Sequence, residues 1–266
     1  MPPIRFNLYP GGKTHAVTLS YDDGVIEDRR LVEILNRHGL KGTFHLNSAT
    51  LDRDINLKRE EIAALYRNHE VSAHSVSHPH LDALPREEFA TEILEDRRAL
   101  ERLVGYPVRG MSYPFGTYSE SIVETLPSLG IEYARTVESH GRFHVPDNLL
   151  LWHPTCHHGQ DLAAKTDAFF SETRTLRLRL LYVWGHSYEF ARKDNWDVIE
   201  QFGDRVAKEE RAWCATNIEI ADYLRALRQL RVNVDGTHVQ NLSHLPLWIT
   251  WNNEPHEIPA GALVVL

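Results

Sequence analysis

The chain has 266 residues, of which 42% are hydrophobic and 25% are charged, and these ordinary proportions exclude a disordered or collagen-like protein. With 29 Lys and Arg against 37 Asp and Glu, the formal net charge is −8, which argues against a nucleic-acid binder because such binding depends on clustered basic residues. No apolar run reaches the roughly 18 residues of a membrane span. The first residues carry no basic segment followed by an apolar run, so we expect a cytoplasmic protein that has no membrane partner.

Short apolar segments alternate with helical patterns along most of the chain. The predicted strands cover residues 16–20, 42–47, 70–74, 109–113, 132–137, 148–152 and 180–184. The predicted helices cover 27–38, 85–104, 118–129 and 216–231, the last opened by Thr216 with Glu219 as its capping-box partner. Parallel neighbours need a crossover, so this alternation predicts a distorted, incomplete (β/α) barrel of about seven parallel strands; a doubly wound open sheet is the alternative.

The two ends of the chain have other patterns. Residues 4–8 and 15–20, separated by a Pro-Gly-Gly-Lys turn, predict an N-terminal hairpin. Residues 245–251 alternate in polarity, and 262–266 form another short apolar run. We therefore expect residues 1–235 to form the barrel with its hairpin, and residues 236–266 to form a small antiparallel β appendage packed on it.

Two adjacent carboxylates follow the first predicted strand in the segment SYDDG, residues 20–24. Gly24 permits a sharp turn, which lets Asp22 and Asp23 face one cavity. In one interpretation, one aspartate binds a metal ion while the other stays free as a base. In the other, the segment is a solvated turn with a helix N-cap; spacing alone favours this second interpretation.

Histidines follow the third predicted strand. His74 and His78 are four residues apart, a spacing that suits two ligands of one ion, whereas loop histidines bonded to backbone carbonyls are the alternative. Two histidines and one aspartate make a three-ligand site with open positions, which can activate water and polarise a carbonyl. A sealed structural zinc site would instead want four ligands, usually including cysteine.

Four segments in this order resemble the polysaccharide deacetylases, the family-four carbohydrate esterases. They are SYDDG at 20–24, AHSVSHPHL at 73–81, YPFG at 113–116 and an apolar strand that ends in His186. The resemblance extends from residue 14 to about residue 230. It implies the incomplete barrel and a metal-dependent hydrolase that removes N- or O-linked acetyl groups from a saccharide.

The resemblance also implies a role for each matching residue. Asp22 matches the catalytic base that activates the attacking water, and His186 matches the catalytic acid. Asp23, His74 and His78 match the ligands of one divalent ion, most often Zn²⁺, with Co²⁺, Ni²⁺ and Mn²⁺ as alternatives. The backbone N–H of Phe115 matches an oxyanion donor, and Trp184 matches an apolar position beside the acetyl methyl. Tyr113 and Trp152 complete the residues that we expect to contact the substrate.

Two departures from the family pattern stand out. The family usually has an arginine just before the proline motif, where this chain has Ser112; Arg109 lies nearby in sequence. A downstream Asp-and-Trp motif is replaced by LWHPTCHHG at 151–159. Here Trp152 would keep the apolar wall, and His153, His157 or His158 would replace the aspartate beside the acid. A separate metal site formed by His153, Cys156 and His157 is the competing interpretation of this segment.

Two other functions fit the same scaffold. Related proteins hydrolyse cyclic amides or ureides, sometimes without a metal, although retention of Asp23, His74 and His78 disfavours this. A non-catalytic sugar-binding protein is the second alternative; the missing arginine and aspartate favour it, and the presence of Asp22 and His186 opposes it. The expected partner is an acetylated saccharide, and the sequence predicts neither its identity nor the oligomeric state.

Overall fold

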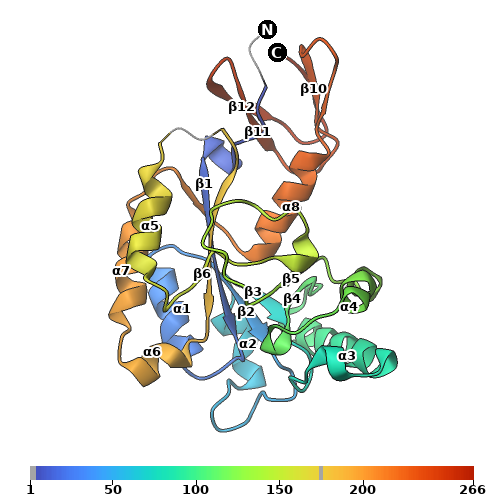
Figure 1. The fold of residues 1–266 in the computed structure, drawn as a ribbon, viewed down its shortest axis with the longest axis vertical. Coiled ribbons are helices and arrows are strands. Elements are labelled where there is room, and N and C mark those ends of the chain that lie inside the picture. The colour runs from blue at the N-terminus through green and yellow to red at the C-terminus, as the bar shows by residue number, and fades with distance from the viewer. Residues whose placement is uncertain (1–3, 174–175) are drawn as a thin grey trace.

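The computed structural model describes residues 4–173 and 176–266 (Figure 1). The strands are β1 (His15–Asp22), β2 (Gly42–Leu46), β3 (Glu70–Ala73), β4 (Gly110–Ser112), β5 (Tyr133–Arg135), β6 (Cys156–His157), β7 (Arg179–Gly185), β8 (Ala212–Cys214), β9 (Arg231–Val232), β10 (His238–Gln240), β11 (Leu247–Trp251), β12 (Glu254–Ile258) and β13 (Leu263–Val265). The α-helices are α1 (Asp28–Arg37), α2 (Arg59–Leu65), α3 (Arg86–Val104), α4 (Glu120–Thr125), α5 (Leu162–Ser171), α6 (Tyr188–Lys193), α7 (Asp197–Ala207) and α8 (Asn217–Arg228).

The main sheet is a half-barrel of seven parallel strands in the order β5-β4-β3-β2-β1-β7-β6. An eighth strand, β8, pairs in parallel with the start of β1 through Val17 and Cys214, while β2 pairs with its end from Leu19 onward. This arrangement confirms the predicted incomplete (β/α) barrel. Because the strands are parallel, their carboxyl ends lie on one edge of the sheet, where ligand-handling residues are expected.

Most predicted elements of the barrel are confirmed. Helix α8 begins as expected, with Thr216 and Glu219 bonded in a capping box. The strand predicted at 148–152 is wrong: Leu149–Leu151 form a 3₁₀ helix, because the side chain of Asn148 accepts the N–H of Leu150 at 2.9 Å and turns the chain. The two- and three-residue strands β6 and β8 were not predicted, because such short segments carry no readable alternation.

The N-terminal segment does not pair with residues 15–20 as predicted. Arg5 pairs with Thr250 of β11, and Tyr9 pairs only with Lys13 across the turn. The C-terminal strands are antiparallel as expected: β11 and β12 form a hairpin, and β13, β10 and β9 form a second sheet. Since β9 begins at Arg231 and already pairs with β10, the division of the chain at residue 235 remains a proposal.

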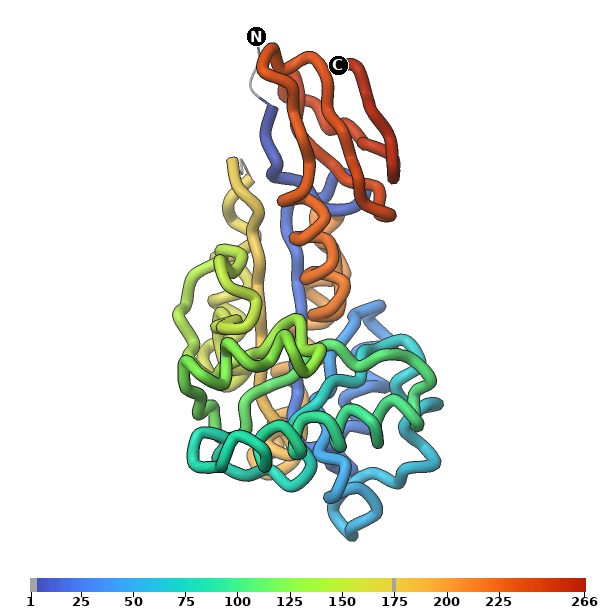
Figure 2. Tube along the Cα trace, turned by 90° about the vertical axis from the view of Figure 1, so that its right-hand side faces the viewer, coloured from blue at the N-terminus to red at the C-terminus, as the bar shows by residue number. Residues whose placement is uncertain are grey.

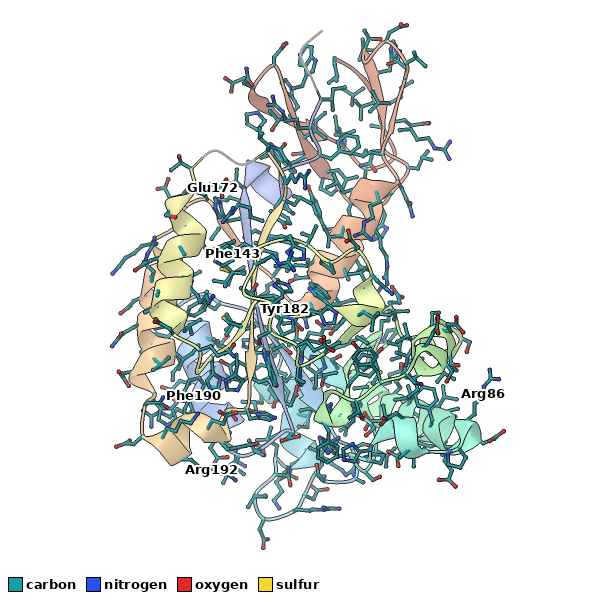
Figure 3. The ribbon with its side chains drawn as sticks, in the orientation of Figure 1. Arg86, Phe143, Glu172, Tyr182, Phe190 and Arg192 are labelled. Carbon is teal, nitrogen blue, oxygen red and sulfur yellow. The ribbon has the colours of Figure 1, made fainter. Side chains whose placement is uncertain are left out.

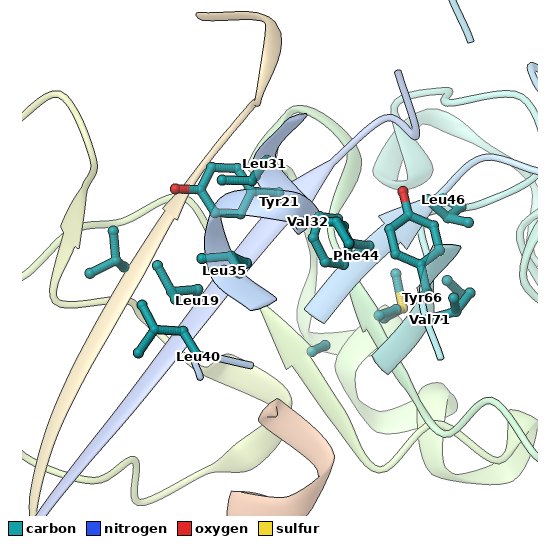
Figure 4. Close-up of a cluster of buried hydrophobic side chains, with 14 of the residues drawn as sticks. Leu19, Tyr21, Leu31, Val32, Leu35, Leu40, Phe44, Leu46, Tyr66 and Val71 are labelled. Carbon is teal, nitrogen blue, oxygen red and sulfur yellow. The ribbon is translucent and has the colours of Figure 1, made fainter. Parts of the chain in front are cut away.

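Two clusters of buried side chains hold the molecule together. One lies between the sheet and its helices and includes Tyr21, Leu35, Phe44 and Tyr66, which Figure 4 shows gathered between β1, β2 and α1. The other joins α8 to the C-terminal strands. The appendage and both termini lie at one end of the molecule, and α6, which follows β7, lies at the other (Figures 1 and 2). Among the described residues, no helix is long and apolar enough to cross a membrane.

Candidate functional site

Three predicted metal ligands meet at the carboxyl edge of the half-barrel. Asp23 follows β1, and His74 and His78 follow β3. The Oδ1 atom of Asp23 lies 3.8 Å from Nε2 of His74 and 3.9 Å from Nε2 of His78. Two ligands of one zinc ion, each about 2 Å from it, lie no more than about 4 Å apart. The three side chains are therefore close enough to share a single ion.

The hydrogen bonds of His74 leave the correct nitrogen available to a metal. Its Nδ1 lies 2.9 Å from the backbone carbonyl oxygen of Ser112, which can only accept, so Nδ1 carries the proton. The lone pair is then on Nε2, the atom that faces Asp23. Burial lowers the pKa of His74 although Asp22 and Asp23 oppose this change, so the neutral ligand form is favoured. An oxygen and two imidazole nitrogens suit zinc or a similar divalent transition ion.

The backbone around this site is strained. Asp23, Ser75, His78 and Phe115 all have positive φ angles, between 57° and 81°, a conformation that residues other than glycine rarely adopt. Such strain is kept where the surrounding structure demands one arrangement, and it concentrates at functional sites. Here it accompanies the convergence of turns after three different strands.

Asp22 points into the interior and is paired with a buried arginine. Its carboxylate bonds to Nη2 of Arg135 from β5, and it accepts the hydroxyl of Ser112 at 3.2 Å. Asp22 is 3% exposed and Arg135 is fully buried. Burial alone would raise the pKa of Asp22, but Arg135, followed by His74, lowers it well below its usual range. Asp22 is therefore held as a carboxylate beside the three candidate ligands.

His186, at the end of β7, faces the same group of side chains. Its Nε2 lies 3.9 Å from Oδ2 of Asp23, and its Nδ1 lies 2.8 Å from Oε1 of Glu189. Burial lowers the pKa of His186, but the Glu189 hydrogen bond and the carboxylates of Asp22 and Asp23 raise it above the ordinary value overall. The site thus contains a carboxylate held ionised and a histidine whose protonated form is favoured.

A second group of metal-ligand residue types lies behind His186. The ligand atoms of His157, His158 and Glu189 are within 4.8 Å of one another. His153, which we also considered beside the acid, instead bonds to the hydroxyl of Thr136 at 2.7 Å. Among the groups that the described residues form, neither His153 nor Cys156 joins His157 in a ligand cluster, so the separate site predicted from these three residues is not assembled.

The predicted substrate aromatics fall into two classes. The ring of Phe115 is 56% exposed and stacks on His80 at 4.1 Å, and Trp184 is half-buried, with Arg135 over its ring at 4.7 Å. By contrast, Tyr113 and Trp152 are each 1% exposed. Trp152 packs between Tyr133 and Tyr182 in the second core cluster. Both side chains are buried in this structure, so the expectation that they contact a substrate stays a prediction.

A cavity of about 410 Å³ opens beside the candidate ligands. Asp23 and His78 form part of its wall, together with Asn47, Ile55, Tyr188 and Arg192. Figure 3 shows Arg192 at the end of the molecule away from the C-terminal strands. The cavity therefore places the ligand group in contact with a space that can admit a small molecule.

A family model for polysaccharide deacetylases matches residues 10–134. Over this segment, which is just under half of its length, the chain is similar to the polysaccharide deacetylases. The matched segment contains Asp22, Asp23, His74, His78 and Phe115, while Arg135, Glu189 and His186 lie beyond it. The match therefore covers β1 to β4 and most of β5, and the residues after 134 are placed by the structure alone.

Individual deacetylases share modest identity with this chain. It is 28% identical over 119 residues to a chitooligosaccharide deacetylase of Sinorhizobium fredii, covering 44% of this chain and 54% of that protein. It is 26% identical over 107 residues to a peptidoglycan-N-acetylglucosamine deacetylase of Bacillus cereus, covering 40% and 38%. The chain thus spans about half the length of the curated relatives that it matches.

A solved structure shows the same fold over most of the chain. It is a Mycobacterium smegmatis protein provisionally named a polysaccharide deacetylase, with a TM-score of 0.62 and 19% identity, and the match covers 86% of this chain and 96% of that one. At this identity the likeness concerns the fold only.

Two residues that the sequence analysis did not predict contact the candidate base and acid. Arg135, from β5, pairs with Asp22, whereas an arginine was expected near Ser112 at the end of β4. Its sequence signal was an arginine inside the predicted strand EYARTV, since a buried cation requires a buried carboxylate. Glu189 places a carboxylate beside His186, with Oε1 at 2.8 Å from Nδ1 of the histidine. Its signal was the i, i+3 spacing from His186 at the start of a helix.

Proposed function

We propose that this chain is a metal-dependent hydrolase that removes N- or O-linked acetyl groups from a saccharide. The observation that carries the proposal is the convergence of Asp23, His74 and His78 on one point, with Asp22 and His186 beside them. The donor set and the protonation of His74 fit a divalent ion, most often zinc. When bound, such an ion polarises a carbonyl and lowers the pKa of water.

We assign Asp22 as the group that accepts a proton from the attacking water. Its carboxylate is kept ionised by Arg135 and lies 3.8 Å from Nε2 of His74, so it borders the place where water would lie next to the ligands. The hydrogen bond from Ser112 and the ion pair fix its orientation. Proton transfer to a positioned base contributes about 10²- to 10⁴-fold in rate.

We assign His186 as the group that protonates the leaving atom. A sugar amine or alkoxide is a poor leaving group without a proton, so an acid must be available. Because Nδ1 of His186 faces Glu189, the proton to be donated is on Nε2, which faces Asp23. The N–H of Phe115, in the tight turn after β4, is assigned to the developing oxyanion, where one such donor is worth about 3 kcal/mol.

The substrate class rests on the relatives and on the surface beside the cavity. Two relatives are named for chitooligosaccharide and for peptidoglycan N-acetylglucosamine, which favours an N-acetylated sugar. The exposed ring of Phe115 and the half-buried ring of Trp184 offer apolar faces of the kind that pack against sugar rings. We therefore propose an N-acetylated saccharide as the substrate to be tried first.

Acetate release from N-acetyl and O-acetyl saccharides, measured on protein of known metal content, tests the proposal. Release that stops with EDTA and returns with added zinc supports it. Hydrolysis of amides or ureides that EDTA does not affect would favour the related amidase function. Saccharide binding without any acetate release, in metal-loaded protein, would favour the sugar-binding function.

A further inference from the structure

The group formed by His157, His158 and Glu189 lies next to the proposed acid His186, and no role follows for it from the family match. Its residue types suit either a second metal site or a hydrogen-bonded support. We propose that Glu189 is a positioning residue for His186, and that His157 fixes the orientation of the Glu189 carboxylate. This inference rests on the proposed deacetylase function and deepens it.

The hydrogen bonds of His157 oppose a metal at this group. Its Nδ1 accepts the backbone N–H of Gly159 at 3.1 Å, so this nitrogen has no proton, and the neutral ring carries its proton on Nε2. Nε2 lies 3.0 Å from Oε1 of Glu189 and therefore donates to it. A metal would need the Nε2 lone pair, which would move the proton to Nδ1 and place it against the N–H of Gly159.

One oxygen of Glu189 accepts from both sides. Oε1 receives Nε2–H of His157 at 3.0 Å and Nδ1–H of His186 at 2.8 Å. The ring of His186 is thereby held with Nε2 toward Asp23, at 3.9 Å from its Oδ2. Without this acceptor the ring could rotate away from Asp23. The donor at Nε2 is the imidazolium, and an acceptor at Nδ1 stabilises that form and keeps the Nε2 proton facing the site.

The other oxygen of Glu189 is anchored separately. Oε2 lies 3.1 Å from Nζ of Lys193 and 3.6 Å from Nε2 of His158. The ring of His158 is 2% exposed and stacks at 4.1 Å on Phe190 of α6, which Figure 3 labels. The carboxylate thus has partners on both oxygens, which fixes its rotamer. Burial would raise the pKa of Glu189, but the hydrogen bonds from His157, His158 and His186 hold it well below its usual range.

The test compares Glu189→Ala and Glu189→Gln on two substrates. An N-acetyl saccharide needs a protonated leaving group, whereas 4-nitrophenyl acetate releases a phenolate that leaves without one. We expect Glu189→Ala to lower kcat on the N-acetyl saccharide on the order of 100-fold and to change turnover of the aryl ester less than about threefold. Glu189→Gln should lose less than Glu189→Ala, because His157 selects the amide oxygen and both hydrogen bonds to it remain.

Two further readouts do not depend on turnover. Metal analysis should find one ion per chain in wild type and in Glu189→Ala. At a pH high enough to leave His186 neutral, its ¹⁵N shifts should report a proton on Nδ1 in wild type and in Glu189→Gln, and a mixture of tautomers in Glu189→Ala. Glu200→Gln is the matched control, because Glu200 of α7 is also a glutamate in contact with a histidine, with its Oε2 at 3.2 Å from Nε2 of His38. Its replacement should change none of these values.

Several results would overturn the inference. An equal loss on both substrates would assign Glu189 a structural role only, and a fall from two ions to one in Glu189→Ala would assign a second metal site. An unchanged His186 tautomer in Glu189→Ala would remove the positioning role. If metal-loaded wild type hydrolyses neither substrate, the proposed deacetylase function itself fails, which the wild-type measurement alone reveals.

Discussion

Two clusters at the same edge of the half-barrel each contain two histidines and one acidic residue, and they differ in protonation. In the cluster of Asp23, His74 and His78, Nδ1 of His74 donates to a backbone carbonyl, so Nε2, which faces Asp23, has a free lone pair. In the cluster of His157, His158 and Glu189, Nδ1 of His157 accepts a backbone N–H, so Nε2 carries the proton and donates to Glu189. The hydrogen bond at Nδ1 therefore distinguishes the proposed metal ligand His74 from the hydrogen-bond donor His157.

The largest effect that separates the two clusters is expected for His78→Ala. Removing one of three ligands should abolish both metal binding and acetate release, because the remaining two donors leave the ion weakly held. The matched variant His157→Ala should keep the metal. Elemental analysis after dialysis checks both variants. A His78→Ala protein that retains one ion per chain would contradict this ligand set.

Asp22→Asn should separate metal binding from turnover within the first cluster. We expect the metal to stay, since Asp22 is not among the proposed ligands, and acetate release to fall about 10²- to 10⁴-fold because the base is lost. Metal content and kcat measured on the same sample decide the outcome. Loss of the metal in this variant would show that Asp22 and Asp23 have exchanged roles.

Arg135→Leu tests the ion pair that holds Asp22. Removing one member of a buried pair leaves the other charge uncompensated, and we expect a loss of about 3–5 kcal/mol in the free energy of unfolding. The double variant Arg135→Leu with Asp22→Asn should recover part of this loss, since no buried charge remains. Urea unfolding of wild type, both single variants and the double variant measures the coupling. Strictly additive losses would mean that the two side chains do not interact.

A smaller effect is expected at Glu70, a buried carboxylate that pairs with no cation among the residues that the structure describes. The Glu70 carboxylate accepts hydrogen bonds from the hydroxyls of Tyr133 and Thr43 and from the N–H of Ile218, at 2.7–2.9 Å. Burial raises the pKa of Glu70 to about 7, and these hydrogen bonds oppose that rise. The folded protein therefore binds this proton more tightly than the unfolded chain, whose glutamate has a pKa near 4.3.

It follows that the Glu70 contribution to stability is largest at acidic pH and is lost as the pH rises from about 4.3 to about 7. Glu70→Gln should reduce this decline by about 1–3 kcal/mol, because the amide does not ionise. Unfolding measured between pH 5 and pH 8, in wild type and the variant, checks the slope. A wild-type stability that rises with pH through a Glu70-dependent step would contradict the assigned direction.

Some of the site could be read from the sequence and some could not. Asp23, His74 and His78 were predictable because they follow strands whose parallel order brings their ends together. Arg135 and Asp22 belong to β5 and β1, which are four strand spacings apart in the sheet order, roughly 19 Å in a flat sheet. They touch only because the half-barrel is curved, and no local pattern reports that curvature.

The exposure of aromatic side chains was also beyond the sequence. Tyr113 and Phe115 are two residues apart in one motif, yet the first is enclosed and the second is 56% exposed. The difference arises from the positive φ of Phe115, which turns the chain after β4. Trp152 was expected beside the substrate because the family resemblance gives it an apolar wall, and its ring packs in the second core cluster.

Anomalous scattering at the zinc edge, from crystals of zinc-loaded protein, locates the ion itself. We expect one strong peak, bonded to Asp23, His74 and His78 at about 2.0–2.2 Å, with none at His157, His158 and Glu189. A peak at the second cluster, or zinc-loaded crystals with no peak among the first three side chains, would contradict this assignment.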